Sequence, residues 1–171
     1  MASLVFAAIV LLTIFILLAL YARGGPTETI NLHGVPPEAA GVTRLSLSEL
    51  GSVTRRLFNE LGFTTVSEMA FPDRYDLVVD DPTPVTGQRI YVRCLLTPEA
   101  GAVQSAEVQS ALDTARGENL AKAEVITTGN FSDEARLISK QTAVELIDGA
   151  TLAELIRKNL PDVANRLGLP R

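Results

Sequence analysis

Cysteine and histidine, which often act as nucleophiles, bases or metal ligands, each occur once in this sequence. Cys94 lies in an apolar stretch, and His33 lies in a segment rich in Gly and Pro. A catalytic thiol needs a neighbouring base and no histidine accompanies Cys94, so we interpret Cys94 as a small core residue and His33 as a solvated side chain. One cysteine also excludes a disulfide within the chain and a zinc site made of cysteines. Carboxylates and basic side chains are the candidates that remain.

Three carboxylates stand at positions where a structural explanation competes with a functional one. Glu49 follows Ser46 by three residues, the spacing of a helix capping box, which explains Glu49 without a ligand role. Asp148 precedes Gly149, a pair typical of a turn. Asp76 begins an apolar stretch, where a buried carboxylate needs a partner. Its position fits either the remnant of a site or an ordinary acid at the edge of a strand.

The pattern of apolar residues predicts the elements that carry these side chains. A helix begins at the Ser46 capping box and ends at Gly62, where a residue free to adopt positive φ is favoured. The predicted strands are residues 63–66, 75–79, 90–96, 123–127 and 144–147, and the later helices are residues 105–116, 133–142 and a last helix that opens with a capping box of Thr151 and Glu154. The order α-β-β-β-α-β-α-β-α predicts an α/β fold with a mixed sheet covered by helices, and parallel pairing where a helix connects two strands.

Residues 2–22 contain no charged side chain, and as a helix they span about 30 Å, the hydrocarbon thickness of a bilayer. A secretory signal peptide would instead carry a basic residue before a shorter apolar stretch, and no Lys or Arg precedes this one. We therefore expect a transmembrane helix. Arg23, the basic residue next to it, predicts a single-pass membrane protein whose soluble domain is cytoplasmic.

The rest of the chain suits one domain of ordinary size. We expect an anchor at residues 1–23, a flexible linker rich in Gly and Pro at 24–44, the folded domain at 45–160 and a C-terminal tail at 161–171, because a proline at position 161 ends or breaks the last helix. The formal net charge of −5 lies outside the apolar segment. It argues against a strongly electropositive nucleic-acid clamp but leaves a local basic patch possible.

Two sequence motifs in the C-terminal half are similar to motifs of a known family. Residues 125–135, VITTGNFSDEA, are similar to a strand, a glycine turn and a helix start of the form F-[ST]-x-x-A, and residues 145–152, ELIDGATL, are similar to an ending of the form L-I-D-G-x-x-L. Together, between about Leu45 and Lys158, the chain resembles the catalytic domain of Mrr-type restriction endonucleases, which are members of the PD-(D/E)xK nuclease superfamily. The resemblance implies a restriction-endonuclease-like three-layer domain with a mixed β-sheet.

The resemblance also implies where the chemistry of such a domain lies. In this superfamily an Asp on one strand, and a Glu or Gln followed two residues later by a Lys on the next strand, converge on Mg²⁺, with a helical Glu nearby. Carboxylate oxygens hold the hard cation, and the Lys stabilises the attacking water and the developing phosphorane. By position Asp76 matches the metal-binding Asp, and Glu49 matches the helical Glu. Arg93 and Leu95 fall at the Gln/Glu and Lys positions of the family's V-Q-C-K-R strand.

The chain departs from the family at the last two of these positions. Arg93 replaces a metal ligand with a cation, and Leu95 replaces the catalytic cation with an alkyl group; no Lys occurs between Val85 and Gln109. We expect no intact catalytic residue and no cofactor, with Mg²⁺ at Asp76 only if an active site persists. Strand alternation sends Arg93 and Leu95 to one face. If the alignment is right, that face also holds Asp76, and Arg93 pairs with it in the place of the metal.

These expectations lead to one preferred function and two alternatives. The preferred one is a membrane-anchored Mrr-type domain that is catalytically inactive and acts as a DNA-binding or interaction module. The second is an active metal-dependent DNA endonuclease with a migrated catalytic residue, for which Arg93 or Arg89 would serve. The third is a membrane-tethered domain that binds a protein partner and has no role with nucleic acid. The oligomeric state stays open.

Overall fold

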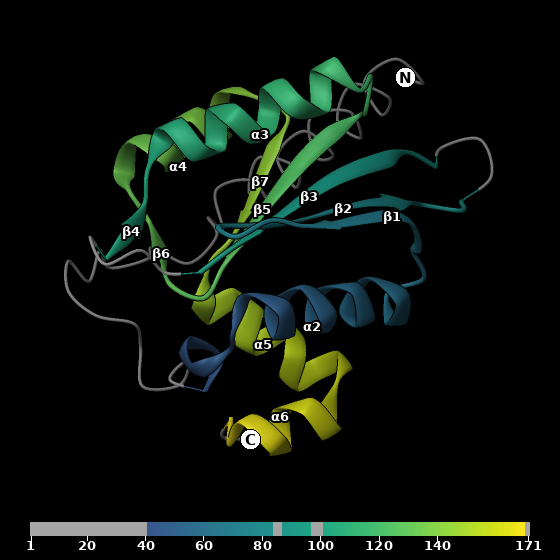
Figure 1. Cartoon of the computed structure of the whole chain (residues 1–171), viewed down its shortest axis with the longest axis vertical. Helices are drawn as coiled ribbons and strands as arrows, with labels where there is room; N and C mark the ends of the chain where they lie inside the picture. The colour runs from purple at the N-terminus through teal and green to yellow at the C-terminus, as the bar shows by residue number, and fades with distance from the viewer. Residues whose placement is uncertain (1–40, 84–86, 97–100, 170–171) are drawn as a thin grey trace, which may run out of the picture. The chain divides into compact units, whose positions relative to one another are not determined.

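A five-stranded sheet in the order β1-β2-β3-β5-β7 forms the centre of the domain (Figure 1). The structure, a computed structural model, describes residues 41–83, 87–96 and 101–169. The strands are β1 (Thr64–Ala70), β2 (Tyr75–Asp80), β3 (Arg89–Leu95), β4 (Ala102–Val103), β5 (Lys122–Thr127), β6 (Asn130–Phe131) and β7 (Val144–Ile147). The helices are the 3-10 turn η2 (Val42–Arg44) and α2 (Leu47–Glu60), α3 (Ser105–Gly117), α4 (Asp133–Gln141), α5 (Gly149–Asn159) and α6 (Pro161–Leu167).

The sheet is mixed, as the order of elements predicts. Strands β1, β2 and β3 form an antiparallel meander, whereas β5 is parallel to β3 and β7 is parallel to β5. Helix α3 connects β3 to β5 and α4 connects β5 to β7, because neighbouring parallel strands need a crossover. The two-residue strands β4 and β6 form a separate parallel pair. The expected α/β arrangement with a mixed sheet is therefore present in the described residues.

Strand alternation divides the core between the two faces of the sheet. On β3, the side chains of Val92 and Cys94 join the cluster under η2, α2, α5 and α6, whereas Tyr91 and Leu95 join the cluster under α3 and α4. Figure 1 shows α3 and α4 on one side of the sheet and α2, α5 and α6 on the other. The expected three layers follow from this division.

The first helix begins as predicted, whereas the last predicted helix begins earlier. Both hydrogen bonds of the Ser46–Glu49 capping box are present at α2. The N-cap of α5 is Asp148, whose Oδ1 accepts from the Thr151 N–H at 3.0 Å, so the predicted capping box at Thr151 is wrong. The helix starts close against the strand loop: a side chain at Gly149 would place its Cβ 2.4 Å from the Thr128 carbonyl oxygen.

Two predicted boundaries of the domain are also corrected. Val42, inside the predicted linker, is fully buried in the core, because η2 packs against α5. Helix α6 occupies most of the predicted tail, with Val163 and Leu169 in the same core. Pro161 ends α5 but stands in the first turn of α6, where its missing N–H leaves no intrahelical bond unmade.

The predicted membrane helix at residues 2–22 lies outside the described residues, as does most of the predicted linker. Within the ranges that the structure describes, no helix combines the length and apolar character needed to cross a bilayer.

Candidate functional site

Asp76 and Arg93 are direct cross-strand neighbours on β2 and β3. The Arg93 Nε lies 3.2 Å from Asp76 Oδ1, and their side chains are 4% and 13% exposed. The sequence-based prediction that these residues form an ion pair is therefore confirmed. Both side chains lie on the face of the sheet that α3 covers, because Arg93 alternates with Val92 and Cys94 of the opposite face.

Arg93 makes further contacts that hold its guanidinium in place. Its Nη2 donates to the Tyr91 hydroxyl at 2.6 Å, and its Nη1 donates to Ser110 Oγ of α3 at 2.9 Å. A buried guanidinium with several acceptors is stabilised, since desolvation of its charge is compensated by hydrogen bonds. We refer to Asp76, Tyr91, Arg93 and Ser110, together with Arg74, as the Arg93 cluster.

Asp76 is bound by a second guanidinium as well. Arg74 Nε donates to Asp76 Oδ2 at 3.1 Å, and the Arg74 guanidinium carbon lies 3.9 Å from the centre of the Phe71 ring. Each oxygen of the Asp76 carboxylate therefore accepts from a different arginine. Sequence reasoning did not identify Arg74, although its position two residues before Asp76 on the same extended stretch could have indicated it.

Tyr91 completes the cluster as a protonated phenol. Burial raises the pKa of Tyr91 to about 12, and its hydrogen bond with Asp76 contributes in the same direction. At neutral pH the phenol therefore keeps its proton, and its oxygen accepts from Arg93. Tyr91 is neither a base nor a nucleophile under these conditions.

Leu95, the residue that the resemblance aligns with the family's lysine, is 7% exposed. It packs with Tyr91 and Val125 in the core beneath α3. This position therefore contributes to packing and presents no charge to solvent.

Glu49 is not brought to the Arg93 cluster. Its carboxylate accepts from the backbone N–H of Ser46 at 2.9 Å and from the Ser46 hydroxyl at 2.7 Å. Helix α2 packs on the sheet face that holds Leu77 and Cys94, opposite the face of Arg93. The capping box accounts for Glu49, and the hydrogen bonds of that box lower its pKa.

Cys94 is inert in this structure, as expected for a core residue. It is fully buried on the α2 side, and its thiol lies 3.4 Å from Thr54 Oγ1. Burial raises the pKa of Cys94 to about 12, so the reactive thiolate is absent at neutral pH.

A divalent cation does not fit the residues of the Arg93 cluster. Hard cations need several free oxygen ligands, whereas both Asp76 oxygens accept from arginines, and Arg93, the residue opposite Asp76 on β3, is itself a cation. Over residues 41–83, 87–96 and 101–169, no group of three or more His, Cys, Asp or Glu side chains is placed to hold a metal ion. The arrangement can stabilise a buried carboxylate but offers no metal-activated water.

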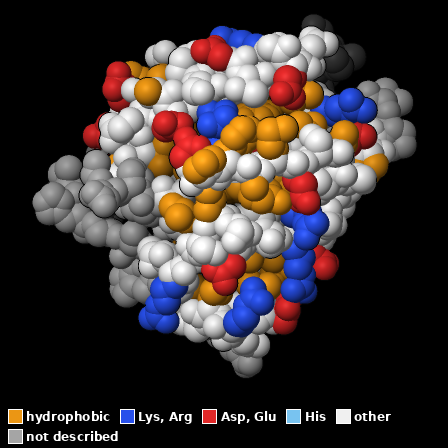
Figure 2. All heavy atoms as spheres, in the orientation of Figure 1, with side chains coloured by type: hydrophobic (Ala, Val, Ile, Leu, Met, Phe, Trp, Pro, Cys, Tyr) orange, Lys and Arg blue, Asp and Glu red, His pale blue; other side chains and the backbone are white. Residues whose placement is uncertain are grey.

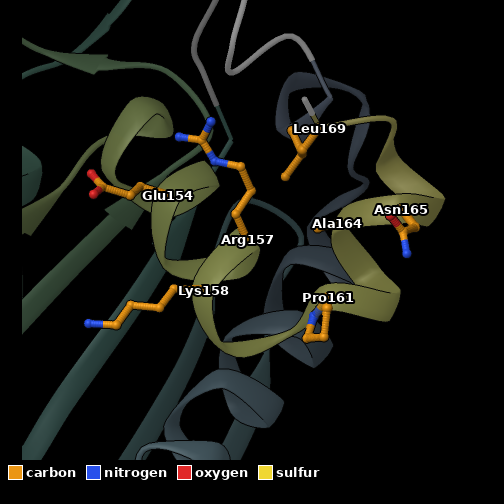
Figure 3. A pocket seen from close by; sticks show the side chains of 7 residues that line it. All are labelled: Glu154, Arg157, Lys158, Pro161, Ala164, Asn165 and Leu169. Atoms are coloured by element: carbon orange, nitrogen blue, oxygen red, sulfur yellow. The ribbon is translucent and has the colours of Figure 1, made fainter. Parts of the chain in front are cut away.

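Two surface depressions flank α6, away from the Arg93 cluster. One, of about 560 Å³, lies between α5 and α6; Pro161, Ala164 and Leu169 are among its lining, and Figure 3 shows the charged side chains of Glu154 and Lys158 directed away from its centre. The other, of about 480 Å³, is lined partly by Arg55, Arg56 and Arg166. The second depression also includes Glu49, whereas neither is lined by Asp76, Arg93 or Leu95.

The mixed sheet between its two helical layers is the fold of a domain of the restriction-endonuclease class. The family model described as the restriction endonuclease Mrr catalytic domain matches residues 42–156, well over half of the chain. The chain belongs to the Mrr-type restriction endonuclease family, within the PD-(D/E)xK nucleases, as its two C-terminal sequence motifs indicate.

Two solved endonuclease structures resemble the chain. The DNA modification-dependent restriction endonuclease AspBHI is 12% identical with a TM-score of 0.55, and the match covers 79% of this chain and 40% of AspBHI. The MspJI restriction endonuclease, in complex with a 27-mer oligonucleotide, is 22% identical with a TM-score of 0.45, and covers 78% of this chain and 30% of MspJI. The chain therefore spans less than half the length of either enzyme, and the likeness to AspBHI shows the fold alone. No curated protein sequence matches the chain.

Proposed function

We propose that this Mrr-family domain is catalytically inactive, is tethered to a membrane by residues 2–22, and binds DNA without cleaving it. The observation that carries the proposal is the buried Arg93 guanidinium, bound to Asp76 at 3.2 Å where the family's nucleases have a metal ligand. Its contacts with Tyr91 and Ser110 make it part of the folded core.

The electrostatics of the cluster support inactivity. A Mg²⁺ ion at Asp76 would have to displace two guanidinium groups and then lie beside both positive charges. Leu95 adds no donor or charge to stabilise a phosphorane. The bound metal ion and the catalytic cation that the family's reaction requires would therefore both be missing from this site.

The alternative of a migrated catalytic cation is less well supported. Arg89 pairs with Asp80 across the strands and lies four residues from Arg93, which along a strand is about 13 Å. It is therefore too far to act at Asp76. Arg93 is in reach of Asp76, but its guanidinium is buried and occupied by hydrogen bonds.

DNA is the ligand favoured by the family, whose matched relative AspBHI is a DNA modification-dependent endonuclease. Although the chain is acidic, basic residues outnumber acidic ones on the layer of η2, α2, α5 and α6. The basic residues there are Arg44, Arg55, Arg56, Arg157, Lys158 and Arg166, and the acidic ones are Glu49, Glu60, Glu154 and Asp162. This layer is the surface that we assign to the phosphate backbone.

The test is a combined binding and cleavage assay on the full chain in mild detergent. We expect salt-dependent binding of duplex DNA by fluorescence anisotropy and no cleavage in Mg²⁺ or Mn²⁺. The variant Arg55→Glu/Arg166→Glu should weaken binding, whereas the matched charge reversal Arg116→Glu/Lys140→Glu on α3 and α4 should not. DNA cleavage that is stopped by EDTA and abolished by Asp76→Ala would overturn the proposal that the domain is catalytically inactive. Absence of DNA binding, with a protein partner retained after nuclease treatment, would instead support a protein-interaction domain.

The membrane tether rests on the uncharged, apolar residues 2–22, and the cytoplasmic orientation rests on Arg23. Deletion of residues 2–22 should move the protein from the membrane fraction to the soluble fraction. A protease added outside intact cells should leave the domain uncut until the membrane is permeabilised. A full-length protein found in the soluble fraction would refute the tether, and digestion in intact cells would refute the orientation.

A further inference from the structure

The depression between α5 and α6 is an apolar groove with charged side chains at its rim. Its volume of about 560 Å³ lies in the range typical of ligand-binding pockets. Pro161, Ala164 and Leu169 supply its apolar lining, and Figure 3 shows Arg157 of α5 and Leu169 on opposite sides of it. A groove of this size and character is suited to a short segment with small apolar side chains.

The chain enters the described domain beside this groove. A Cβ atom added at Gly41 would lie 2.5 Å from the Leu167 carbonyl oxygen and 2.7 Å from the Leu169 Cδ2 atom. Leu169 also lines the groove, so Gly41 packs directly against one of its walls. Because consecutive Cα atoms are about 3.8 Å apart, the chain that precedes Gly41 begins next to the groove.

The segment that precedes Gly41 has the composition that the groove requires. Residues 35–40 read VPPEAA, in which Glu38 is the one charged residue. The chain divides between Gly34 and Val35, so residues 35–40 belong to the same unit as the described domain. Two consecutive prolines restrict the backbone to extended conformations, which lowers the entropy that the segment loses when it binds.

We propose that residues 35–40 bind as an extended segment in the groove between α5 and α6, with Glu38 at its basic rim. The rim carries Arg157 and Lys158 against the single acid Glu154, so its charge is complementary to that of the segment. Figure 2 shows Lys and Arg side chains gathered over the layer of α2, α5 and α6. The apolar lining receives the side chains on either side of Glu38.

Binding of this segment shortens the free part of the linker. A flexible linker over residues 24–44 would have a root-mean-square length of about 23–27 Å, whereas residues 24–34 alone would have about 17–20 Å. The domain would then be held closer to the end of the apolar residues 2–22. This consequence applies to the proposed membrane tether, but the binding of residues 35–40 does not depend on it.

The test is disulfide cross-linking within the full chain in mild detergent, measured by mass spectrometry of the monomer. Under mild oxidation, Ala39→Cys should form a disulfide with Asn165→Cys in the groove several-fold faster than with Ser52→Cys, the matched control. Both partner positions are exposed, and they line the two depressions that flank α6. The native chain suits this experiment, since its single cysteine, Cys94, is fully buried.

Changes within the segment distinguish specific binding from random motion of the linker. Adding Val35→Asn to the Ala39→Cys/Asn165→Cys chain should slow the cross-linking several-fold, because it removes an apolar contact with the groove. Adding Thr29→Asn, outside the proposed segment, should leave the rate unchanged. Glu38→Lys should also slow the reaction, and Arg157→Glu in the Glu38→Lys chain should restore part of the rate.

Three results would overturn the proposal. The first is cross-linking to Asn165→Cys no faster than to Ser52→Cys, and the second is an equal effect of Val35→Asn and Thr29→Asn. The third is a several-fold faster reaction in a chain that lacks residues 170–171, because those residues would then be the occupants of the groove. The cross-linking is measured without DNA, so its failure leaves the proposed function intact.

Discussion

Replacing Arg93 by Met should destabilise the domain because it leaves the Asp76 carboxylate in a site that is only 13% exposed. Met fills much of the volume of the arginine stem, so the main loss is the charge and its hydrogen bonds to Tyr91 and Ser110. Breaking a buried ion pair by removing one partner costs about 3–5 kcal/mol. Because Asp76 keeps Arg74 and Tyr91, we expect the lower end, about 3 kcal/mol in the free energy of unfolding.

The measurement is urea unfolding at neutral pH together with the melting temperature. A loss of about 3 kcal/mol corresponds to a fall in Tm of roughly 10 °C for a domain of this size. Asp76→Asn in the Arg93→Met background removes the uncompensated charge. The double variant should therefore be more stable than the sum of the two single changes predicts, with a coupling energy of about 2 kcal/mol.

The matched control is the exposed pair of Arg56 and Asp162. It is shorter, at 2.7 Å, but its side chains are 49% and 62% exposed. Because solvent screens such a pair, Arg56→Met and the cycle with Asp162→Asn should change stability little. Equal coupling energies for the two pairs would refute the argument that burial gives the Arg93 pair its strength.

Three further predictions follow from the same geometry. Arg93→Gln/Leu95→Lys restores the family's pattern and should create Mn²⁺ binding, seen as loss of the free-ion signal in electron paramagnetic resonance. The wild type and Arg93→Met should show no Mn²⁺ binding. A double variant that binds no Mn²⁺ would contradict the assigned positions. Cys94, with a pKa of about 12, should react with iodoacetamide at pH 8 only as the domain unfolds in urea, and rapid labelling of native protein would contradict its burial. Asp148→Ala should cost about 1–2 kcal/mol at pH 7 through loss of the α5 cap. Burial alone would raise the pKa of Asp148, but its hydrogen bonds with Thr151 and Arg136 outweigh burial and lower the pKa below the ordinary 3.8. The stability lost in Asp148→Ala should therefore shrink as the pH falls from about 3.8 through the lower pKa of the folded state. A loss of stability that does not depend on pH would exclude this linkage.

Local patterns were sufficient to predict much of the fold and the central ion pair. The alternation of strands and helices gave the mixed pairing of the sheet, because parallel neighbours need a crossover helix. The resemblance aligned β2 with β3, and the two-residue period of a strand then placed Arg93 with Asp76. These are properties of short segments and of their order along the chain.

The wrong or missing predictions depended on contacts between distant segments. Asp148 and Thr151 both fit the spacing of a helix cap, and the observed choice accompanies a hydrogen bond between Arg136 and Asp148 at 3.0 Å. Residues 67–70 of β1 were not predicted as strand, because their side chains are exposed and supply no apolar alternation. Pro161 was taken as the end of the domain, although the apolar positions that follow it pack in the core.

Because two arginines bind Asp76, the presence of this aspartate does not depend on the metal chemistry that the resemblance assigns to it. Loss of Asp76 would leave the buried Arg93 charge without its carboxylate partner, so folding alone is a sufficient reason to keep the acid. Under the proposed function, a survey that infers activity from this aspartate alone would wrongly count the domain as an enzyme.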